Sequence, residues 1–281
     1  MTAPGFVARF RRNRGAVVGA IVLFAVLIAA VSAPLLAPTD PWAMAGAPFR
    51  APLADGFLLG TDTLGRDIAA GIVHGARVSL LIGLVSTSVA LSIGVLLGAV
   101  AGYYGGWVDD AVMRFTEFFQ TIPNFVLLVV LVALFQPSIA SIVVAIGVVS
   151  WPPLARIVRG KFLSLRSREF VQAAIVLGQS NARIIATQIL PNSLSPIIVS
   201  ASLMVATAIL LESALSFLGL GDPNVMSWGY MIGAARTVMR QAWWMPVFPG
   251  LAIVLTVLAL NLVGEGLSDA LNPRLGREGR A

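Results

Sequence analysis

The stretch 16-AVVGAIVLFAVLIAAVSAPLLAP-38 contains no charged side chain. A bilayer hydrocarbon core of about 30 Å is crossed by roughly 20 helical residues, so this stretch is long enough to span it. It is also longer than the apolar region of about 7–15 residues that a cleaved signal peptide carries. We therefore expect a retained transmembrane helix over about residues 16–37.

The rest of the chain has the same character, since 58% of its 281 residues are hydrophobic and only 11% are charged. Soluble domains typically carry about 25% charged residues. So few charges cannot cover a globule of this size with polar surface, whereas lipid can solvate an apolar exterior. The composition therefore predicts a membrane protein.

Composition also excludes several kinds of site. The net charge of +6 does not indicate nucleic-acid binding, because the basic residues lie between long apolar runs, where they act as topology signals. The chain has no cysteine, which excludes disulfides, zinc–thiolate sites and thiol catalysis. A single histidine, His74, argues against a histidine-based metal or catalytic site. We assign no catalytic residue and no metal ligand.

Six segments are long and apolar enough to cross a bilayer, which predicts an all-α fold with six transmembrane helices. Within the third segment Pro123 predicts a kink, and within the fourth Trp151-Pro152-Pro153 predicts a kink or an end. The segments are about 16–37, 78–102, 110–135, 138–158, 194–218 and 245–266.

The distribution of basic residues predicts the orientation, because cytoplasmic loops are enriched in Lys and Arg. Of the 19 basic residues, 14 fall on the side that holds both termini and the stretch 159–193. The other five fall on the side that holds the loop 38–77. We therefore expect both termini in the cytoplasm. The cytoplasmic set is Arg9, Arg11, Arg12, Arg14, Arg114, Arg156, Arg159, Lys161, Arg166, Arg168, Arg183, Arg274, Arg277 and Arg280, and the outer set is Arg50, Arg66, Arg77, Arg236 and Arg240.

The inner stretch 168-REFVQAAIVLGQSNARIIATQILPN-192 predicts two short helices. The first ends at Gly178, a residue that readily adopts the left-handed conformation of a helix terminator. Ser180 or Asn181 can cap the second, and Pro191 should end it. From periodicity alone, the favoured interpretation is an amphipathic helix pair lying on the lipid surface.

The order of residues in this stretch indicates another role. Gln172-Ala173-Ala174, then Gly178, then nine residues to Gln188-Ile189-Leu190-Pro191, resembles the EAA loop of bacterial ABC-importer permeases. The resemblance implies a coupling helix that sits in a groove of an ATPase subunit. Gln172 stands where that family usually has Glu, and Gln188 where it often has Ile or His. The implied coupling residues are Glu169, Gln172, Ala173, Ala174, Gly178, Ser180, Arg183, Leu190 and Pro191.

Further strings resemble the C-type permease of dipeptide, oligopeptide and nickel importers. They are 9-RFRRNRGAVVG-19, 34-PLLAPTDP-41, 59-LGTDTLGRD-67, 75-GARVSL-80, 215-LSFLGLGDP-223, 227-SWGYMI-232 and 248-FPGLAIVLTVLALNLVGEGLSDALNPRLG-276. Together they cover nearly the whole chain in order. The resemblance implies a type I ABC-importer permease fold, with residues 1–77 as an N-terminal part and 78–281 as a five-helix core carrying a coupling loop at about 164–191.

The outer loop and one deep carboxylate are further candidate sites. In the loop, turn-forming glycines and carboxylates that can cap amides favour a fold over the mouth of the bundle. The alternative is docking of an external substrate-binding protein, with the candidates Asp62, Gly65, Arg66 and Asp67. Glu212 lies inside the fifth segment and should face the bundle interior. Glu212 either lines the transport pathway or contacts another subunit, or it makes a structural hydrogen bond to a neighbouring helix or a partner subunit.

Energy for transport must come from outside this chain. A Walker A loop needs a lysine followed by Ser or Thr, but the only lysine, Lys161, is followed by Phe162. We therefore expect no cofactor on this chain and no enzymatic activity of its own. The resemblance implies ATP and Mg on two ATPase subunits (or one used twice), a second homologous permease and an extracytoplasmic substrate-binding protein, with membrane lipid around them and no nucleic acid.

Two other classes of function remain as alternatives. A secondary transporter or channel working alone would need several buried ionisable groups or matching broken helices in two halves. An intramembrane enzyme would need paired deep carboxylates or another catalytic set. Because only Glu212 is deep and no two-half symmetry is visible, we favour a permease of the plasma membrane that imports di- or oligopeptides by alternating access.

Overall fold

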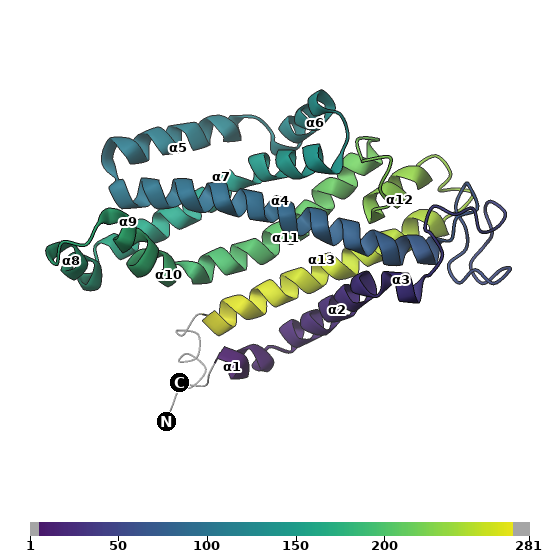
Figure 1. Ribbon diagram of the computed structural model, residues 1–281, viewed down its shortest axis with the longest axis horizontal. Coiled ribbons are helices and arrows are strands. Elements are labelled where there is room, and N and C mark those ends of the chain that lie inside the picture. The colour runs from purple at the N-terminus through teal and green to yellow at the C-terminus, as the bar shows by residue number, and fades with distance from the viewer. Residues whose placement is uncertain (1–5, 272–281) are drawn as a thin grey trace.

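The computed structural model describes residues 6–271, and the described residues form helices and connecting loops without a β-strand. Figure 1 shows most of the long helices running roughly lengthwise side by side. The elements are α1 (Phe6–Arg12), α2 (Arg14–Val31), α3 (Ala33–Leu36), α4 (Ile68–Tyr104), α5 (Gly106–Thr121), α6 (Asn124–Phe135), α7 (Ile139–Arg166), α8 (Glu169–Val176), α9 (Asn181–Ile184), the π-helical turn η1 (Ile185–Ile189), α10 (Leu190–Asn192), α11 (Leu194–Phe217), α12 (Trp228–Ala235) and α13 (Trp244–Leu271).

Within the described residues, five helices (α2, α4, α7, α11 and α13) are each long and apolar enough to cross a membrane. The third predicted segment, about 110–135, consists of α5 and α6, which meet the same criterion only as a pair bent by 81°. The break lies at Ile122-Pro123, so the kink predicted at Pro123 is confirmed. Because proline has no backbone N–H and fixes its own φ angle, it interrupts the helix at this point.

The two ends of the bundle carry different features (Figure 1). One end, called here the α8 end, holds α1, α8–α10 and the C-terminal end of α13. The opposite end, called the α12 end, holds α3, α12 and the loop 37–67. The two loops predicted to lie on opposite sides of the membrane therefore lie at opposite ends. Three arginines counted for the orientation, Arg274, Arg277 and Arg280, are outside the described residues.

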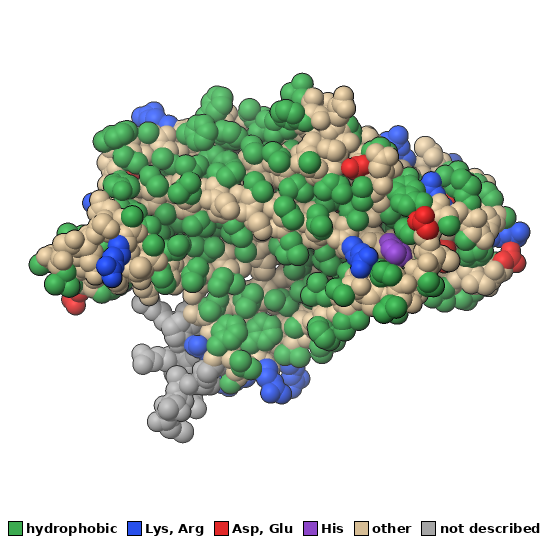
Figure 2. Space-filling model, viewed as in Figure 1, with side chains coloured by type: hydrophobic (Ala, Val, Ile, Leu, Met, Phe, Trp, Pro, Cys, Tyr) green, Lys and Arg blue, Asp and Glu red, His purple; other side chains and the backbone are tan. Residues whose placement is uncertain are grey.

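The visible surface is largely apolar between these ends (Figure 2). Large hydrophobic side chains such as Phe24 on α2, Leu96 on α4 and Leu134 on α6 are well exposed. An exterior of this kind would be unfavourable in water but is solvated by acyl chains. The surface thus agrees with the membrane protein that the composition predicts.

Helices α4 and α7 form the central contact of the bundle, and glycines let them approach closely. A Cβ atom placed on Gly98 would lie 2.5 Å from the carbonyl oxygen of Ala155 and 2.8 Å from Cβ of Val158. Gly94 and Gly102 meet α7 in the same way. Small residues are common where membrane helices pack, because they allow close approach of the backbones.

Substitution of Gly98 by alanine should therefore destabilise the protein by about 1–3 kcal/mol, because the methyl group must push α4 from α7. Gly160 is a matched control on α7, since a Cβ there meets nothing within 4 Å. Gly160→Ala should leave the protein as stable or raise its stability by up to about 1 kcal/mol through helix propensity. Thermal unfolding of detergent-extracted variants measures both effects, and equal midpoints would contradict this account of the contact.

Two predicted boundaries were wrong. The fourth segment was predicted over about 138–158 with a kink or an end at Trp151-Pro152-Pro153. It does not end there, since α7 continues to Arg166 while packing along α4. Membrane helices tolerate internal proline when neighbouring groups satisfy the freed backbone. The second segment begins at Ile68 rather than 78, since Asp67 caps α4 by accepting the backbone N–H of Ala69 at 2.8 Å. Residue 77 therefore lies inside α4, and the division into 1–77 and 78–281 stays a prediction.

Candidate functional site

The first half of the inner loop folds as predicted. Helix α8 ends at Val176, and Gly178, just beyond the C-cap residue Leu177, has a φ of +74°, the left-handed conformation expected of a helix terminator. The backbone N–H of Gly178 donates to the carbonyl of Ile175 at 2.9 Å, and that of Gln179 donates to Ala174 at 3.1 Å. Ser180 then caps the next helix by accepting the N–H of Arg183 at 3.4 Å.

The second half differs from the prediction, since Pro191 does not end a regular helix. Helix α9 makes one turn, continues into the π-helical η1 and then into α10, which contains Pro191 in its first turn. Proline is tolerated there because the first turn of a helix needs no N–H from that residue. The π turn inserts an extra residue per turn, which local sequence patterns do not reveal.

One face of the inner loop is buried against the bundle. Tyr103, near the end of α4, donates its hydroxyl hydrogen to Oδ1 of Asn181 at 2.8 Å. Nε2 of Gln172 donates to the carbonyl of Arg166 at 3.0 Å. The apolar members of this contact are Val171, Ala174, Ile184 and Ile189 from the loop, with Leu154, Val158 and Phe162 from α7. The inner loop is therefore packed against both α4 and α7.

The other face of α8 has no partner among the described residues. Val176 is 86% exposed and Leu177 is 78% exposed, and Phe170 and Ile175 are also exposed. We call Val176 and Leu177 the α8 tip. Helix α7 is about 42 Å long from its 28 residues, which exceeds the hydrocarbon thickness of about 30 Å. Figure 1 shows α8 at the far edge of the α8 end, and exposed apolar side chains of this kind mark either a protein interface or a membrane-contact surface.

The predicted coupling residues divide between these two faces. Ala174 is buried against the bundle, and Leu190 is half-buried. Glu169, Gln172, Ala173, Gly178, Ser180, Arg183 and Pro191 are exposed.

At the α12 end, the candidate loop residues mainly hold the loop itself in shape. Oδ1 of Asp62 accepts the N–H groups of Leu64 and Arg66 at 2.8 and 2.9 Å. Gly65 has a φ of +78° and packs directly on the carbonyl of Gly46, where a side chain would clash. Asp67 is the cap of α4. The predicted fold of this loop over the end of the bundle is confirmed.

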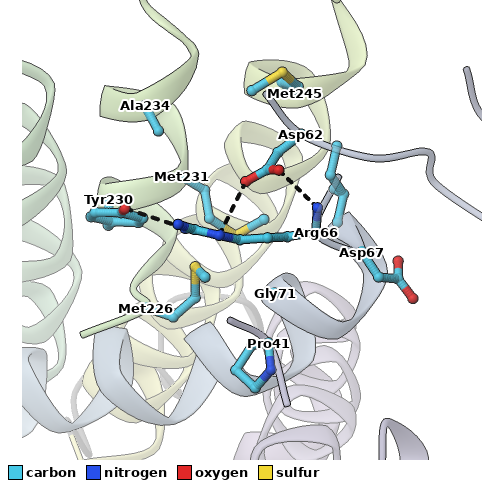
Figure 3. A pocket seen from close by; sticks show the side chains of 11 residues that line it. Pro41, Asp62, Arg66, Asp67, Gly71, Met226, Tyr230, Met231, Ala234 and Met245 are labelled. Atoms are coloured by element: carbon cyan, nitrogen blue, oxygen red, sulfur yellow. Dashed lines mark hydrogen bonds and ion pairs between the residues drawn. The ribbon is translucent and has the colours of Figure 1, made fainter. Parts of the chain in front are cut away.

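Arg66 joins this loop to α12 (Figure 3). Its guanidinium carbon lies 4.6 Å from the centre of the Trp42 ring, within cation–π range. Nε lies 3.8 Å from Oδ2 of Asp62, and Nη1 donates to the hydroxyl of Tyr230 at 3.4 Å. Asp67 points away from this group in Figure 3. Arg66 thus connects the loop to α12 through its contacts with Trp42, Asp62 and Tyr230.

Trp244 and Thr61 also hold this loop on the end of the bundle, and neither residue was identified from the sequence. Trp244 is only 7% exposed, and its Nε1–H donates to the carbonyl of Thr61 at 3.1 Å. The Thr61 hydroxyl donates to the carbonyl of Ala47 at 2.7 Å and accepts the N–H of Arg50 at 2.9 Å. A tryptophan beside the membrane boundary usually indicates an interfacial anchor, so the sequence offered no signal for this burial.

Glu212 faces the bundle interior, as predicted, and is 2% exposed. Its Oε1 accepts hydrogen bonds from the hydroxyls of Ser216 at 2.9 Å and Ser227 at 2.7 Å. Ser227 caps α12, so the carboxylate connects α11 to the start of α12. Oε2 has no hydrogen-bond partner among the described residues. A Cβ atom on Gly229 would lie 2.7 Å from both carboxylate oxygens, so only glycine permits this approach.

Two further polar contacts join elements far apart in sequence. Arg159 on α7 forms a double hydrogen bond with the buried Asp109 on α5. Oδ2 of Asp222 accepts the N–H of Ile139 at 3.0 Å, which caps α7 from the loop before α12. No spacing in the sequence indicates either pair. Within residues 6–271, no group of three His, Cys, Asp or Glu side chains is placed to hold a metal ion.

These features define a polytopic membrane permease with a protruding loop anchored to its central helices. A family model described as binding-protein-dependent transport system inner membrane component matches residues 94–277. A second, described as the N-terminal TM domain of oligopeptide transport permease C, matches residues 5–52. The chain belongs to the family of binding-protein-dependent transport system inner membrane components.

Curated relatives match almost the full chain. A dipeptide transport system permease protein of Alkalihalophilus pseudofirmus is 42% identical over 273 residues, covering 95% of this chain and 88% of the relative. A di/tripeptide transport system permease protein of Pseudomonas aeruginosa is 40% identical over 284 residues, covering 96% and 91%. An oligopeptide transport system permease protein of Haemophilus influenzae is 42% identical over 273 residues, covering 95% and 86%.

Solved structures agree on the fold. The MetNI methionine ABC transporter in an inward-facing conformation gives a TM-score of 0.60 at 18% identity, covering 72% of this chain and 96% of that one. At this identity the likeness supports the fold alone. The chain is thus a multi-pass inner-membrane permease subunit of an ABC importer, which works with ATPase and substrate-binding partners.

Proposed function

We propose that this chain moves di- or oligopeptides inward across the plasma membrane. The observation that carries the proposal is identity of 40–42% over at least 95% of the chain to permeases named for dipeptides, di/tripeptides and oligopeptides. Selectivity resides largely with the substrate-binding protein, and the permease provides the path. The chain itself binds no cofactor, and the partner ATPase subunits bind ATP and Mg.

In this proposal the α8 tip inserts into a groove of an ATPase subunit. Closure of the ATPases pulls on the loop, and the buried cluster around Ala174 and Phe162 transmits the movement to α7. The hydrogen bond from Tyr103 to Asn181 engages α4 at the same time. Since α4 and α7 pack tightly, they move as one body between two discrete arrangements of the bundle. In this proposal, the substrate crosses the membrane when the helices switch as rigid bodies from one arrangement of the bundle to the other.

The assembly contains a second homologous permease and two ATPase subunits, or one used twice. Both chain termini and the α8 end face the cytoplasm, in agreement with the excess of Lys and Arg predicted on that side. The α12 end then faces the substrate-binding protein. Arg66, held by Trp42, Asp62 and Tyr230, gives the loop a fixed shape on which that protein docks.

Deletion of this chain's gene should abolish uptake of a labelled dipeptide, and restoring the gene should return it. The same extract, solubilised in mild detergent, should yield the chain together with a second permease and an ATPase. Uptake of nickel measured in parallel separates the two cargo classes that share this branch. Unchanged peptide uptake in the deletion strain would contradict the cargo. Ion-driven uptake by liposomes that contain this chain alone would favour a secondary transporter instead.

A further inference from the structure

Arg77 lies on the exposed side of α4 and bonds to the end of α2. Its Nε donates to the carbonyl of Ala30 at 2.5 Å, and Nη2 donates to the carbonyl of Val31 at 3.1 Å. These carbonyls belong to the last turn of α2, which the C-cap Ser32 closes. The last carbonyls of a helix lack partners within the helix and carry partial negative charge. Arg77 therefore ties α2 to α4.

This arrangement leaves the charge of Arg77 without a counter-ion among residues 6–271. The ion pairs of the described residues are Arg50–Asp55, Arg66–Asp62 and Arg159–Asp109, so none includes Arg77. A guanidinium group has five N–H donors, of which the two carbonyls occupy two. Three donors therefore stay available on an exposed cation. Such a cation is costly beside hydrocarbon unless it meets an anion or the headgroup region.

The depth of Arg77 suits a lipid headgroup. Helix α2 begins at Arg14 and ends at Val31, and a rise of 1.5 Å per residue separates these two by about 25 Å. With Arg14 at one boundary of a hydrocarbon core of about 30 Å, Val31 lies close to the other boundary. Arg77, bonded to Val31, thus reaches the level of phosphate groups in the leaflet on the α12 side.

An open apolar groove of about 370 Å³ adjoins Arg77 between α2 and α4. The other lining residues are all apolar: Leu27, Ala30, Val31, Leu80, Leu81, Leu84 and Val85. A cation at the headgroup level with an apolar groove beside it matches the two parts of a phospholipid, an anionic phosphate and an acyl chain. Neither a soluble anion nor an apolar peptide would use both parts.

We propose that Arg77 and this groove bind one phospholipid of the leaflet on the α12 side, with its phosphate on the free guanidinium N–H groups and an acyl chain along Leu81 and Leu84. The lipid neutralises Arg77 and fills the gap between α2 and α4. This assigns a role to the string 75-GARVSL-80. Gly75 and Ser79 contact Trp228 on the interior side of α4, and Arg77 serves the membrane side. Lipid binding at this site requires that the protein lie in a membrane, and it does not depend on which substrate the importer carries.

Native mass spectrometry of the full chain in detergent, titrated with phosphatidylglycerol, tests the proposal. Arg77→Gln should weaken lipid binding about tenfold, because charge-assisted hydrogen bonds to phosphate are lost. Leu84→Trp should weaken binding similarly by filling the groove while leaving Arg77 intact. Leu84 is exposed, so its replacement does not disturb the fold. Arg240→Gln, a control that removes an exposed charge elsewhere at the α12 end, should change binding by less than twofold.

Equal lipid retention by the Arg77, Leu84 and Arg240 variants would overturn the proposal. Displacement of the lipid by inorganic phosphate alone would also overturn it, since the groove would then contribute nothing. The cysteine-free chain allows one more test. Cross-linking of a Leu81→Cys variant to another protein in membranes would also overturn the proposal, since a protein would then occupy the groove.

Discussion

Replacing both Val176 and Leu177 with aspartate should reduce ATP-driven uptake at least about 100-fold. The α8 tip is largely exposed in the isolated chain, so the replacements leave its fold and membrane insertion intact. In the assembled importer, they would place two carboxylates in an apolar groove without partners. Burying even one unpaired charge costs several kcal/mol, and each 1.4 kcal/mol is a factor of ten in binding. Uptake and co-purification of the ATPase are the two measurements.

A matched control introduces one aspartate elsewhere at the α8 end, outside the tip. Leu163 lies near the end of α7, at the same end of the bundle, and is partly exposed. Leu163→Asp should keep most of the uptake, because this position precedes the loop. Normal ATPase binding by the double aspartate variant would contradict docking through the tip and favour the alternative in which α8 lies on the lipid surface.

Gly178 gives a weaker test of the same contact. A Cβ atom there meets nothing within 4 Å, so a larger residue causes no clash inside the chain. Its φ of +74° costs a non-glycine residue about 1–2 kcal/mol. A bulky side chain at Gly178 therefore acts mainly by blocking a partner's approach. Gly178→Ala carries the same backbone cost without the bulk, so loss of uptake in the bulky variant alone, at equal thermal stability of the two variants, would support close approach of the ATPase at this glycine.

The helices and the first half of the inner loop followed from the sequence because their signals are local. Long apolar runs define membrane helices, since lipid offers no alternative partner to the backbone. Gly178 and Ser180 took their predicted roles because a left-handed terminator and a side-chain cap act within a few residues. Pro123 broke its helix for an equally local reason.

The parts that sequence reasoning missed depend on residues brought together by packing. Asp222 caps a helix that begins 83 positions earlier, and Asp109 pairs with Arg159 across 50 positions. Trp244 is buried because the loop around Thr61 folds back over it. Pro152 and Pro153 stay inside α7 because α4 packs along that helix. Each of these outcomes depends on a neighbour that is distant in sequence, which no local pattern reveals.

Replacing Glu212 with alanine should lower uptake at least about tenfold, whereas Glu212→Gln should retain most of it. In the alanine variant, the hydroxyls of Ser216 and Ser227 lose their acceptor deep in the bundle, and a cavity opens beside Gly229. Leaving such groups unpaired costs about 1–3 kcal/mol each. Since Ser227 caps α12, the contact between α11 and the start of α12 would be weakened.

The glutamine variant decides between the two roles open to Glu212. A glutamine carbonyl can accept both serine hydroxyls, so a purely structural hydrogen bond survives the loss of charge. Reduced thermal stability of Glu212→Ala alone would support that role. If Glu212→Gln fails in uptake as completely as Glu212→Ala while keeping its stability, the carboxylate charge itself is required. Oε2, which is buried here without a hydrogen-bond partner among the described residues, would then have to become accessible to a second permease or the moving substrate when the helices rearrange.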